Sequence, residues 1–362
     1  MKILHQNCGK MKNNVLPELK ILDKSSFVIP QKRLLITSEG FEERSLSFAK
    51  LLQGDKIFID AFICKYYPEK RSRDAELLPL IENITKNEPQ LIEFSRYEPY
   101  KFEEKFQEQI NHLVNYDEIV IDISVMSKLL ICIIVYLFKN KNVTIRIIYC
   151  EPNEYCPTFE EYNSNKDIYG KALDLPSFGV HDVVRTPFLS SIVMQRTPSV
   201  LITFLSFNEQ LIRALLSSLN PAHLILINGI PPHLKWREKA MQEIHNNIIN
   251  EFHNDNPLNK GFLSRRTSTL YMEQTFESLA NIYKEYCFTN RIIISPTGSK
   301  MQAVACALLK ICCPDVHIEY PTPESYFIKG FSSSTIRNIH ELQLPLFKSL
   351  ITNIAEEYQL NF

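Results

Sequence analysis

The stretch RLLITSEGFEERSLSFAKLLQ, residues 33–53, has the same pattern as SVLITFLSFNEQLIRALLSSL, residues 199–219. Each stretch begins with a β-branched, apolar run typical of a buried strand, continues through a short polar loop and ends with helical spacing. Gly40 and Phe41 of the first stretch align with Ser206 and Phe207 of the second, 166 residues later. A repeat of this kind predicts two copies of one structural unit.

Two further pairs of segments follow in the same order. VIDISVMSK (120–128) aligns with IIISPTGSK (292–300), and YCEPNEY (149–155) aligns with YPTPESY (320–326), at offsets of 172 and 171 residues. Any two α/β domains share an alternation of strand, loop and helix, and that alternative explains the apolar pattern alone. The matches extend into loop residues, which favours duplication.

Apolar strands alternate with amphipathic helices, which predicts an α/β fold of two tandem Rossmann-like domains, each a mainly parallel sheet flanked by helices. We expect an N-terminal extension over 1–30, a first domain over 31–156, a connector over 157–197 and a second domain over 198–362, closed by a helix over 342–359. The expected strands are 34–37, 56–62, 91–94, 118–123 and 143–149 in the first copy, and 200–204, 224–228, 266–270, 291–294 and 316–320 in the second.

The charge balance bears on the class of partner. The chain has 362 residues, and 40 Lys and Arg residues balance 41 Asp and Glu residues. Proteins that bind long duplex nucleic acid usually carry a basic excess, so we do not expect such a partner. A small anionic ligand needs only a few local cations and stays possible.

Nine cysteines are scattered without the spacing of a zinc site, so we expect reduced, buried thiols, a cytoplasmic protein and no metal or cofactor. The apolar stretch 119–138 contains Asp122 and Lys128, which favours a strand, a loop and a helix over a membrane span. No signal-peptide pattern is found, and no membrane partner is expected.

Ligands of open parallel sheets bind beyond the carboxyl ends of the strands, where two loops of each copy are expected. One loop follows the first strand and the other follows the fourth. The turn 295–300 combines hydroxyls, a glycine and a lysine at the start of a helix, where backbone amides favour an anion. The alternative is that Ser299 only caps the helix while Lys300 is solvated. The predicted ligand-binding residues of these loops are Gly40, Phe41, Arg44, Ser124, Ser127, Lys128, Ser206, Asn208, Thr297, Gly298, Ser299 and Lys300.

The basic start of the second helix of each copy is another candidate. Trp236 and Arg237 are predicted to contact a base by stacking and by charge, with half-buried packing of the tryptophan as the alternative. Their counterparts in the first copy are Lys70, Arg71 and Arg73. Arg44 either binds phosphate or pairs with a nearby glutamate. No hydrolase, zinc-protease or deaminase motif is present, so no catalytic residue is assigned.

The turn SPTGSKM (295–301) resembles the TGGTK-type turn of CRISPR-associated Rossmann-fold (CARF) domains. Two such domains in one chain resemble the SAVED domains of bacterial antiphage signalling systems. The resemblance implies that a cyclic oligonucleotide binds at the junction of the two units, held by Thr297, Ser299 and Lys300 together with Ser127 and Lys128. The first copy departs from the pattern, because its SVMSK loop has no glycine.

Three functions are open at this point. The leading hypothesis is a sensor or regulatory subunit of antiphage defence that binds the messenger and reports to a separate effector protein. The second is a metal-independent ring nuclease that cleaves the messenger, with Lys300 or Arg44 stabilising the developing charge. The third is a non-catalytic subunit whose loops bind protein.

Overall fold

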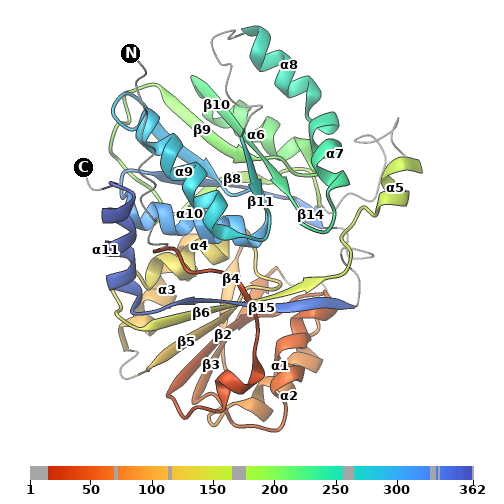
Figure 1. The fold of residues 1–362 in the computed structure, drawn as a ribbon, viewed down its shortest axis with the longest axis vertical. Helices are drawn as coiled ribbons and strands as arrows, with labels where there is room; N and C mark the ends of the chain where they lie inside the picture. The colour runs from red at the N-terminus through yellow and green to blue at the C-terminus, as the bar shows by residue number, and fades with distance from the viewer. Residues whose placement is uncertain are drawn as a thin grey trace, which may run out of the picture.

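The computed structural model describes residues 15–68, 72–112, 116–164, 177–255, 265–326, 332 and 335–360, and Lys70 and Arg71 lie outside them. Two mainly parallel sheets lie one above the other with helices between them and on their outer faces (Figure 1). The predicted α/β class, with mainly parallel sheets flanked by helices, is thereby confirmed.

The first sheet has seven strands in the spatial order β4–β3–β2–β5–β6–β15–β1. The first five of these are parallel, whereas β15 and β1 are antiparallel to their neighbours. The bounds are Gln90–Ser95 for β4, Asp60–Tyr67 for β3, Arg33–Ser38 for β2, Glu118–Asp122 for β5, Thr144–Pro152 for β6, Ile336–Leu344 for β15 and Lys20–Ile21 for β1.

The second sheet has six strands in the order β11–β10–β9–β12–β13–β8. Its first five strands are parallel, and β8 is antiparallel to β13. The five parallel strands follow one another along the chain in the same spatial order as those of the first sheet. The bounds are Arg266–Ser268 for β11, His223–Ile230 for β10, Ser199–Phe204 for β9, Arg291–Ser295 for β12, His317–Thr322 for β13 and Asp182–Arg185 for β8.

All ten expected strands are present. The main difference is β3, which was expected over 56–62 and begins at Asp60. Its neighbour β2 pairs with it only from Leu34 opposite Asp60 onward, so residues 56–59 precede the ladder.

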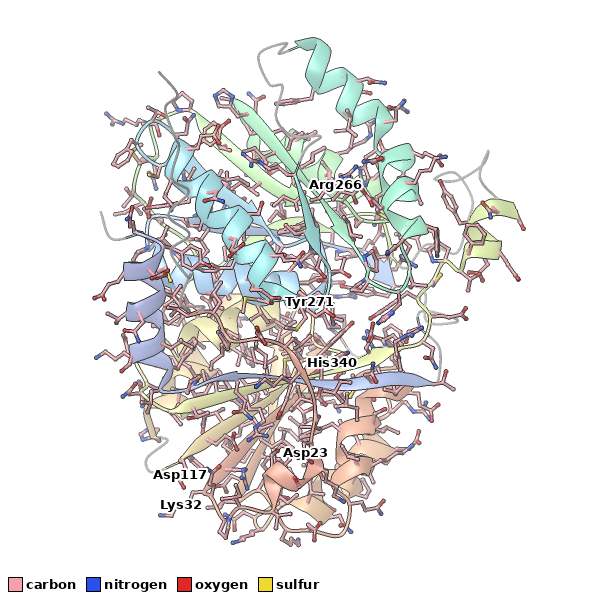
Figure 2. All side chains as sticks on the ribbon, viewed as in Figure 1. Asp23, Lys32, Asp117, Arg266, Tyr271 and His340 are labelled. Atoms are coloured by element: carbon pink, nitrogen blue, oxygen red, sulfur yellow. The ribbon has the colours of Figure 1, made fainter. Side chains whose placement is uncertain are left out.

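Two of the antiparallel strands, β8 and β15, are exchanged between the sheets. We call the part of the chain up to β8 the first half and the part from β9 onward the second half. β8 belongs to the first half but pairs with β13 of the second sheet, while β15 belongs to the second half but pairs with β6 of the first. A short ribbon of β7 (Ser177–Phe178) and β14 (Ser325–Tyr326) joins the halves. Figure 2 labels His340 on β15, whose Nε2 atom lies 2.9 Å from Oε2 of Glu151 on β6.

The expectation of one helix over 342–359 was wrong at its start. Residues 342–344 end β15, and α11 begins only at Phe347. Leu342 and Leu344 are buried while Gln343 between them is exposed, which is the alternation of a strand. The expected connector also contains α5 (Phe159–Ser164), β7 and β8.

Helices α4 (Lys128–Leu137) and α10 (Lys300–Cys312) pack against each other between the sheets. Nearly all their residues are buried, as expected for helices that are apolar on every side. The Cys132 Sγ atom lies 3.4 Å from the carbonyl oxygen of Ala303 across this contact. One hydrophobic core therefore joins the inner faces of both sheets.

The remaining helices complete the layers. The inner core also includes residues of α3 (Pro99–His112), α9 (Met272–Tyr286) and α11 (Phe347–Glu357). The outer face of the first sheet packs against η1 (Lys24–Phe27), η2 (Glu43–Leu46), α1 (Ser47–Leu52) and α2 (Asp74–Ile84). The outer face of the second sheet packs against α6 (Glu209–Leu219), α7 (Trp236–Ile244) and α8 (Asn246–Asp255).

The eight cysteines within the described ranges are buried free thiols. None of the helices in those ranges has the length and apolar character needed to cross a bilayer.

Candidate ligand site between the two sheets

Two adjoining pockets lie where the strand-end loops of the two halves meet. The first pocket, of about 160 Å³, is lined mainly by the loops after β2, β3, β4 and β5. The second pocket, of about 260 Å³, is lined by the loops after β6, β9, β10 and β12 and by the region around β7. Lys128, Lys300, Tyr320 and Tyr326 line both, so these four residues form the wall that the pockets share.

Twelve of the fourteen residues predicted from the sequence line one or both of these pockets. Gly40, Phe41 and Ser127 line the first pocket, and Lys128 and Lys300 line both. The predicted residues that line the second pocket alone are Arg44, Ser206, Asn208, Thr297, Gly298, Ser299 and Arg237. Ser124 and Trp236 line neither.

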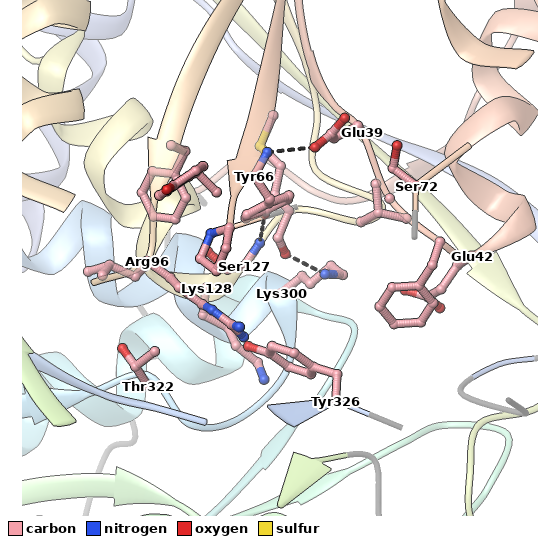
Figure 3. Close-up of a pocket in the computed structure, with 18 of the residues that line it drawn as sticks. Glu39, Glu42, Tyr66, Ser72, Arg96, Ser127, Lys128, Lys300, Thr322 and Tyr326 are labelled. Atoms are coloured by element: carbon pink, nitrogen blue, oxygen red, sulfur yellow. Dashed lines mark hydrogen bonds between the residues drawn. The ribbon is translucent and has the colours of Figure 1, made fainter. Parts of the chain in front are cut away.

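Lys300 is the first residue of α10, and its side chain crosses to the other half. Its Nζ atom donates a hydrogen bond to the main-chain carbonyl of Met126, in the loop after β5 (Figure 3). Desolvation in the pocket wall, followed by repulsion from Arg44, lowers the pKa of Lys300 well below its ordinary value.

Lys128 occupies the equivalent position at the start of α4. Ser127 caps this helix by accepting a hydrogen bond from the Leu130 amide at 3.2 Å. The Lys128 ammonium has no hydrogen bond or ion pair with any residue of the described ranges. Desolvation, followed by repulsion from Arg44, lowers its pKa to about 8. The two lysines therefore form a cationic centre whose charge an anion would stabilise.

Arg44 is held in place by the protein. Its guanidinium forms two hydrogen bonds with the Glu42 carboxylate, at 2.8 and 2.9 Å, and a third with the Cys150 carbonyl at 3.4 Å. Burial alone would raise the pKa of Glu42, but the Arg44 guanidinium holds it below its ordinary value. Of the two roles left open for Arg44, the structure shows the pairing with a glutamate.

The hydroxyls of the SPTGSK turn bond to the protein itself. Thr297 Oγ1 accepts from the Phe204 amide at 3.0 Å and donates to the Phe204 carbonyl at 2.6 Å. Ser299 caps α10 by accepting from the Gln302 amide at 3.1 Å, and its hydroxyl lies 2.6 Å from the Thr269 carbonyl oxygen. A Cβ atom at Gly298 would come within 2.9 Å of Phe204. These residues fix the shape of the turn and thereby place Lys300.

The loops after β2 and β9 also have structural roles. A Cβ atom at Gly40 would lie 2.9 Å from the side chain of Val125, so glycine allows the loops after β2 and β5 to touch. Asn208 caps α6 through Oδ1, and its Nδ2 donates to Ser177 Oγ at 3.0 Å. Ser206 Oγ lies 3.3 Å from the Asn208 amide.

Arg237 and Trp236 stabilise the chain around 155–162. Arg237 donates to the carbonyls of Tyr155, Cys156 and Pro157 at 3.0–3.3 Å. The Trp236 ring packs against Tyr162, with centroids 5.5 Å apart, which matches the packing alternative. The predicted counterpart Arg73 pairs with Glu76 at 2.9 Å and lines neither pocket.

Ser124 is buried beneath the site. It hydrogen-bonds to Asp122 and accepts from the Cys150 amide at 2.8 Å. It therefore connects two strands and does not reach the pocket.

The sequence reasoning missed several pocket residues. The first pocket is also lined by Tyr66 near the end of β3, by Arg96 directly after β4 and by Thr322 at the end of β13 (Figure 3). All three occupy carboxyl ends of parallel strands, so the rule that selected the loops after the first and fourth strands would have found them had it been applied to every strand.

No known protein-family model matches the sequence, and no curated protein is significantly similar to it. Within the ranges that the structure describes, no three His, Cys, Asp or Glu side chains are grouped as metal ligands would be. The site is therefore characterised by its own geometry: two ammonium groups, aromatic rings and hydroxyls at the junction of two sheets.

Proposed function

We propose that the chain contains two copies of a CARF-like unit and binds a nucleotide messenger of the cyclic-oligonucleotide class between them. One observation carries the proposal: Lys128 and Lys300, from corresponding loops of the two halves, share one pocket wall, and neither forms an ion pair with a carboxylate of the described residues. Phosphate suits two ammonium donors at helix N-termini, because its oxygens accept charge-assisted hydrogen bonds.

The topology supports a duplication. Counted along the chain, the five parallel strands of each half lie side by side in the order third, second, first, fourth and fifth. An antiparallel strand, β15 in the first sheet and β8 in the second, then pairs with the fifth. The corresponding strands β5 and β12 are each followed by a serine-capped helix that begins with a lysine. An isolated resemblance between two α/β sheets would not account for both features and for the reciprocal exchange of β8 and β15.

The rings around the lysines support a nucleotide in preference to a simple anion. Phe41, Tyr66 and Phe94 line the first pocket, and Tyr320 and Tyr326 line the shared wall. Aromatic rings bind bases by stacking, with little dependence on base identity. Cationic and aromatic groups in one cavity thus match the two parts of a nucleotide.

A sensor or regulatory subunit of antiphage defence, reporting to a separate effector protein, is the form of this function that the CARF-like and SAVED-like resemblance favours. The engagement of Arg44 by Glu42 removes one of the two cations considered for ring cleavage and leaves Lys300. Binding without cleavage is therefore the primary proposal.

Calorimetric titration with cyclic di-, tri- and tetranucleotides tests it, followed by chromatography of the recovered ligand. We expect one of these compounds to bind and to be recovered intact. Lys300→Met should weaken binding by about tenfold to a hundredfold, the value of a charge-assisted hydrogen bond. Arg213→Lys is the control, because Arg213 pairs with Glu209 and Glu251 outside both pockets.

The other outcomes are equally clear. Linear products in the recovered ligand would replace the sensor with a ring nuclease. An absence of binding by every compound, or an unchanged affinity in folded Lys300→Met protein, would overturn the proposal and favour the protein-binding alternative.

A further inference from the structure

Arg96, which follows β4, has an unused pair of donors. Its Nε and Nη2 atoms are buried and have no hydrogen-bond partner among the described residues. These two nitrogens form one edge of the guanidinium, whose parallel N–H bonds match two oxygens of a phosphate. Buried donors are normally satisfied, so two unpaired donors in a residue that lines a cavity point to a missing acceptor.

Two tyrosines hold the guanidinium without occupying those donors. The Cζ atom of Arg96 lies 5.1 Å from the ring centroid of Tyr97 and 5.8 Å from that of Tyr326. Ring contacts of this kind restrict the plane of a guanidinium. Tyr326 belongs to β14 of the second half, so both halves of the chain build this position.

Thr322 provides a third unused group in the same pocket. Its side chain is 2% exposed, and its Oγ1 atom has no hydrogen-bond partner within the described ranges. Thr322 ends β13, whereas Arg96 follows β4, so the two residues approach the first pocket from opposite sheets (Figure 3). Lys128 lines this pocket as well.

We infer that Arg96 and Thr322 form a second phosphate-binding position, in addition to the lysine pair, and that the ligand carries at least two phosphate groups. The nucleotide character of that ligand rests on the proposed function. The phosphate position rests on the unpaired donors of Arg96 and Thr322, so the two can fail separately.

A double-mutant cycle with two adenosine compounds tests the inference. Adenosine 3′,5′-bisphosphate has a phosphate on each side of the nucleoside, whereas adenosine 5′-monophosphate has only one. The variants are Arg96→Lys, which keeps the charge but removes the paired donors, Lys300→Met and the double variant. Arg213→Lys is the matched control, and thermal unfolding of each variant confirms that it is folded.

We expect Arg96→Lys and Lys300→Met each to weaken binding of the bisphosphate by about tenfold, with additive losses in the double variant, because each contacts a different phosphate. For the monophosphate the losses should not add, because one phosphate occupies only one position. Thr322→Val keeps the volume of the side chain and should weaken bisphosphate binding by about fivefold. An unchanged bisphosphate affinity in folded Arg96→Lys protein would overturn the inference.

Inorganic phosphate separates the two proposals if neither adenosine compound binds. Binding of phosphate that Arg96→Lys weakens and Arg213→Lys does not would retain the phosphate position and remove only the nucleotide. Binding of succinate with equal affinity would assign the position to carboxylates and overturn the inference. An absence of phosphate binding would overturn it too.

Discussion

The Nζ atom of Lys300 donates a hydrogen bond to the main-chain carbonyl of Met126, 174 residues earlier in the chain. Met126 lies two residues before Lys128, so Lys300 is tied to the loop that carries Lys128. A lysine ammonium has three N–H donors, and one carbonyl uses only one of them. The contact therefore positions the ammonium and leaves donors for a ligand.

Ligand affinity is expected to fall as the pH rises through about 8. The pKa of Lys128 is lowered to about 8 by desolvation and then by Arg44, and a bound anion would raise it again. Binding therefore takes up protons, and affinity should fall by up to about tenfold per pH unit above this pKa. Titrations at pH 7 and 9, in buffers of different protonation enthalpy, measure both effects. A flat profile without proton uptake would contradict a role for the charged lysine.

Lys128→Met should stabilise the protein while it weakens binding. A folded-state pKa of about 8, below the ordinary 10.5, means that the unfolded chain binds this proton more tightly. Wild-type stability should therefore rise with pH between about 8 and 10.5, and the variant should lack that rise. At pH 7 we expect the free energy of unfolding to increase by about 1–3 kcal/mol. Chemical denaturation measures it, with the exposed Lys105→Met as a control that changes little.

Glu42→Gln should destabilise the protein strongly. The substitution leaves the Arg44 guanidinium, which is 2% exposed, without its charged partner. The loss of one partner of a buried pair typically costs about 3–5 kcal/mol. The matched control is Glu251→Gln, which breaks the exposed pair with Arg213 and should cost less than about 1 kcal/mol. Equal effects of the two substitutions in urea denaturation would show that Arg44 does not depend on Glu42.

Gly40→Ala should destabilise the junction of the loops after β2 and β5. Its Cβ atom would lie 2.9 Å from two carbon atoms of Val125, and such overpacking costs about 1–3 kcal/mol. Val125→Gly removes Cβ and Cγ2, the two atoms at this distance, so the double variant should lose less stability than the sum of the two single variants. Additive losses in a denaturation cycle would contradict a direct clash.

The sequence was sufficient to place the ten strands, with β3 displaced by four residues at its start, because a short apolar run followed by a polar loop favours a buried parallel strand. It was insufficient for β15, because the pattern around Leu342 fits a strand end or a helix start, and its partner β6 is far away in the chain. The exchange of β8 is equally invisible locally, since nothing in four residues specifies which sheet they join.

The same limit applies to the site. The rule that ligands bind at strand ends predicted that Lys128 and Lys300 lie in one site, and both line the shared wall of the pockets. The rule could not predict the hydrogen-bond partners of each side chain. Thr297 and Ser299 have the residue types of an anion site, yet their hydroxyls bond to neighbouring backbone. Arg96 lies in no matched segment, and its open donors are visible only when its surroundings are known.

The reciprocal exchange of β8 and β15 constrains how the two halves can move when a ligand binds. Each sheet holds a strand of the other half through main-chain hydrogen bonds, and α4 and α10 pack together in one core between the sheets. The two halves are thus linked by two crossings of the chain and by a common core. We therefore expect a bound ligand to act through local rearrangement at the mouth of the pockets, and not through separation of the halves as two independent lobes.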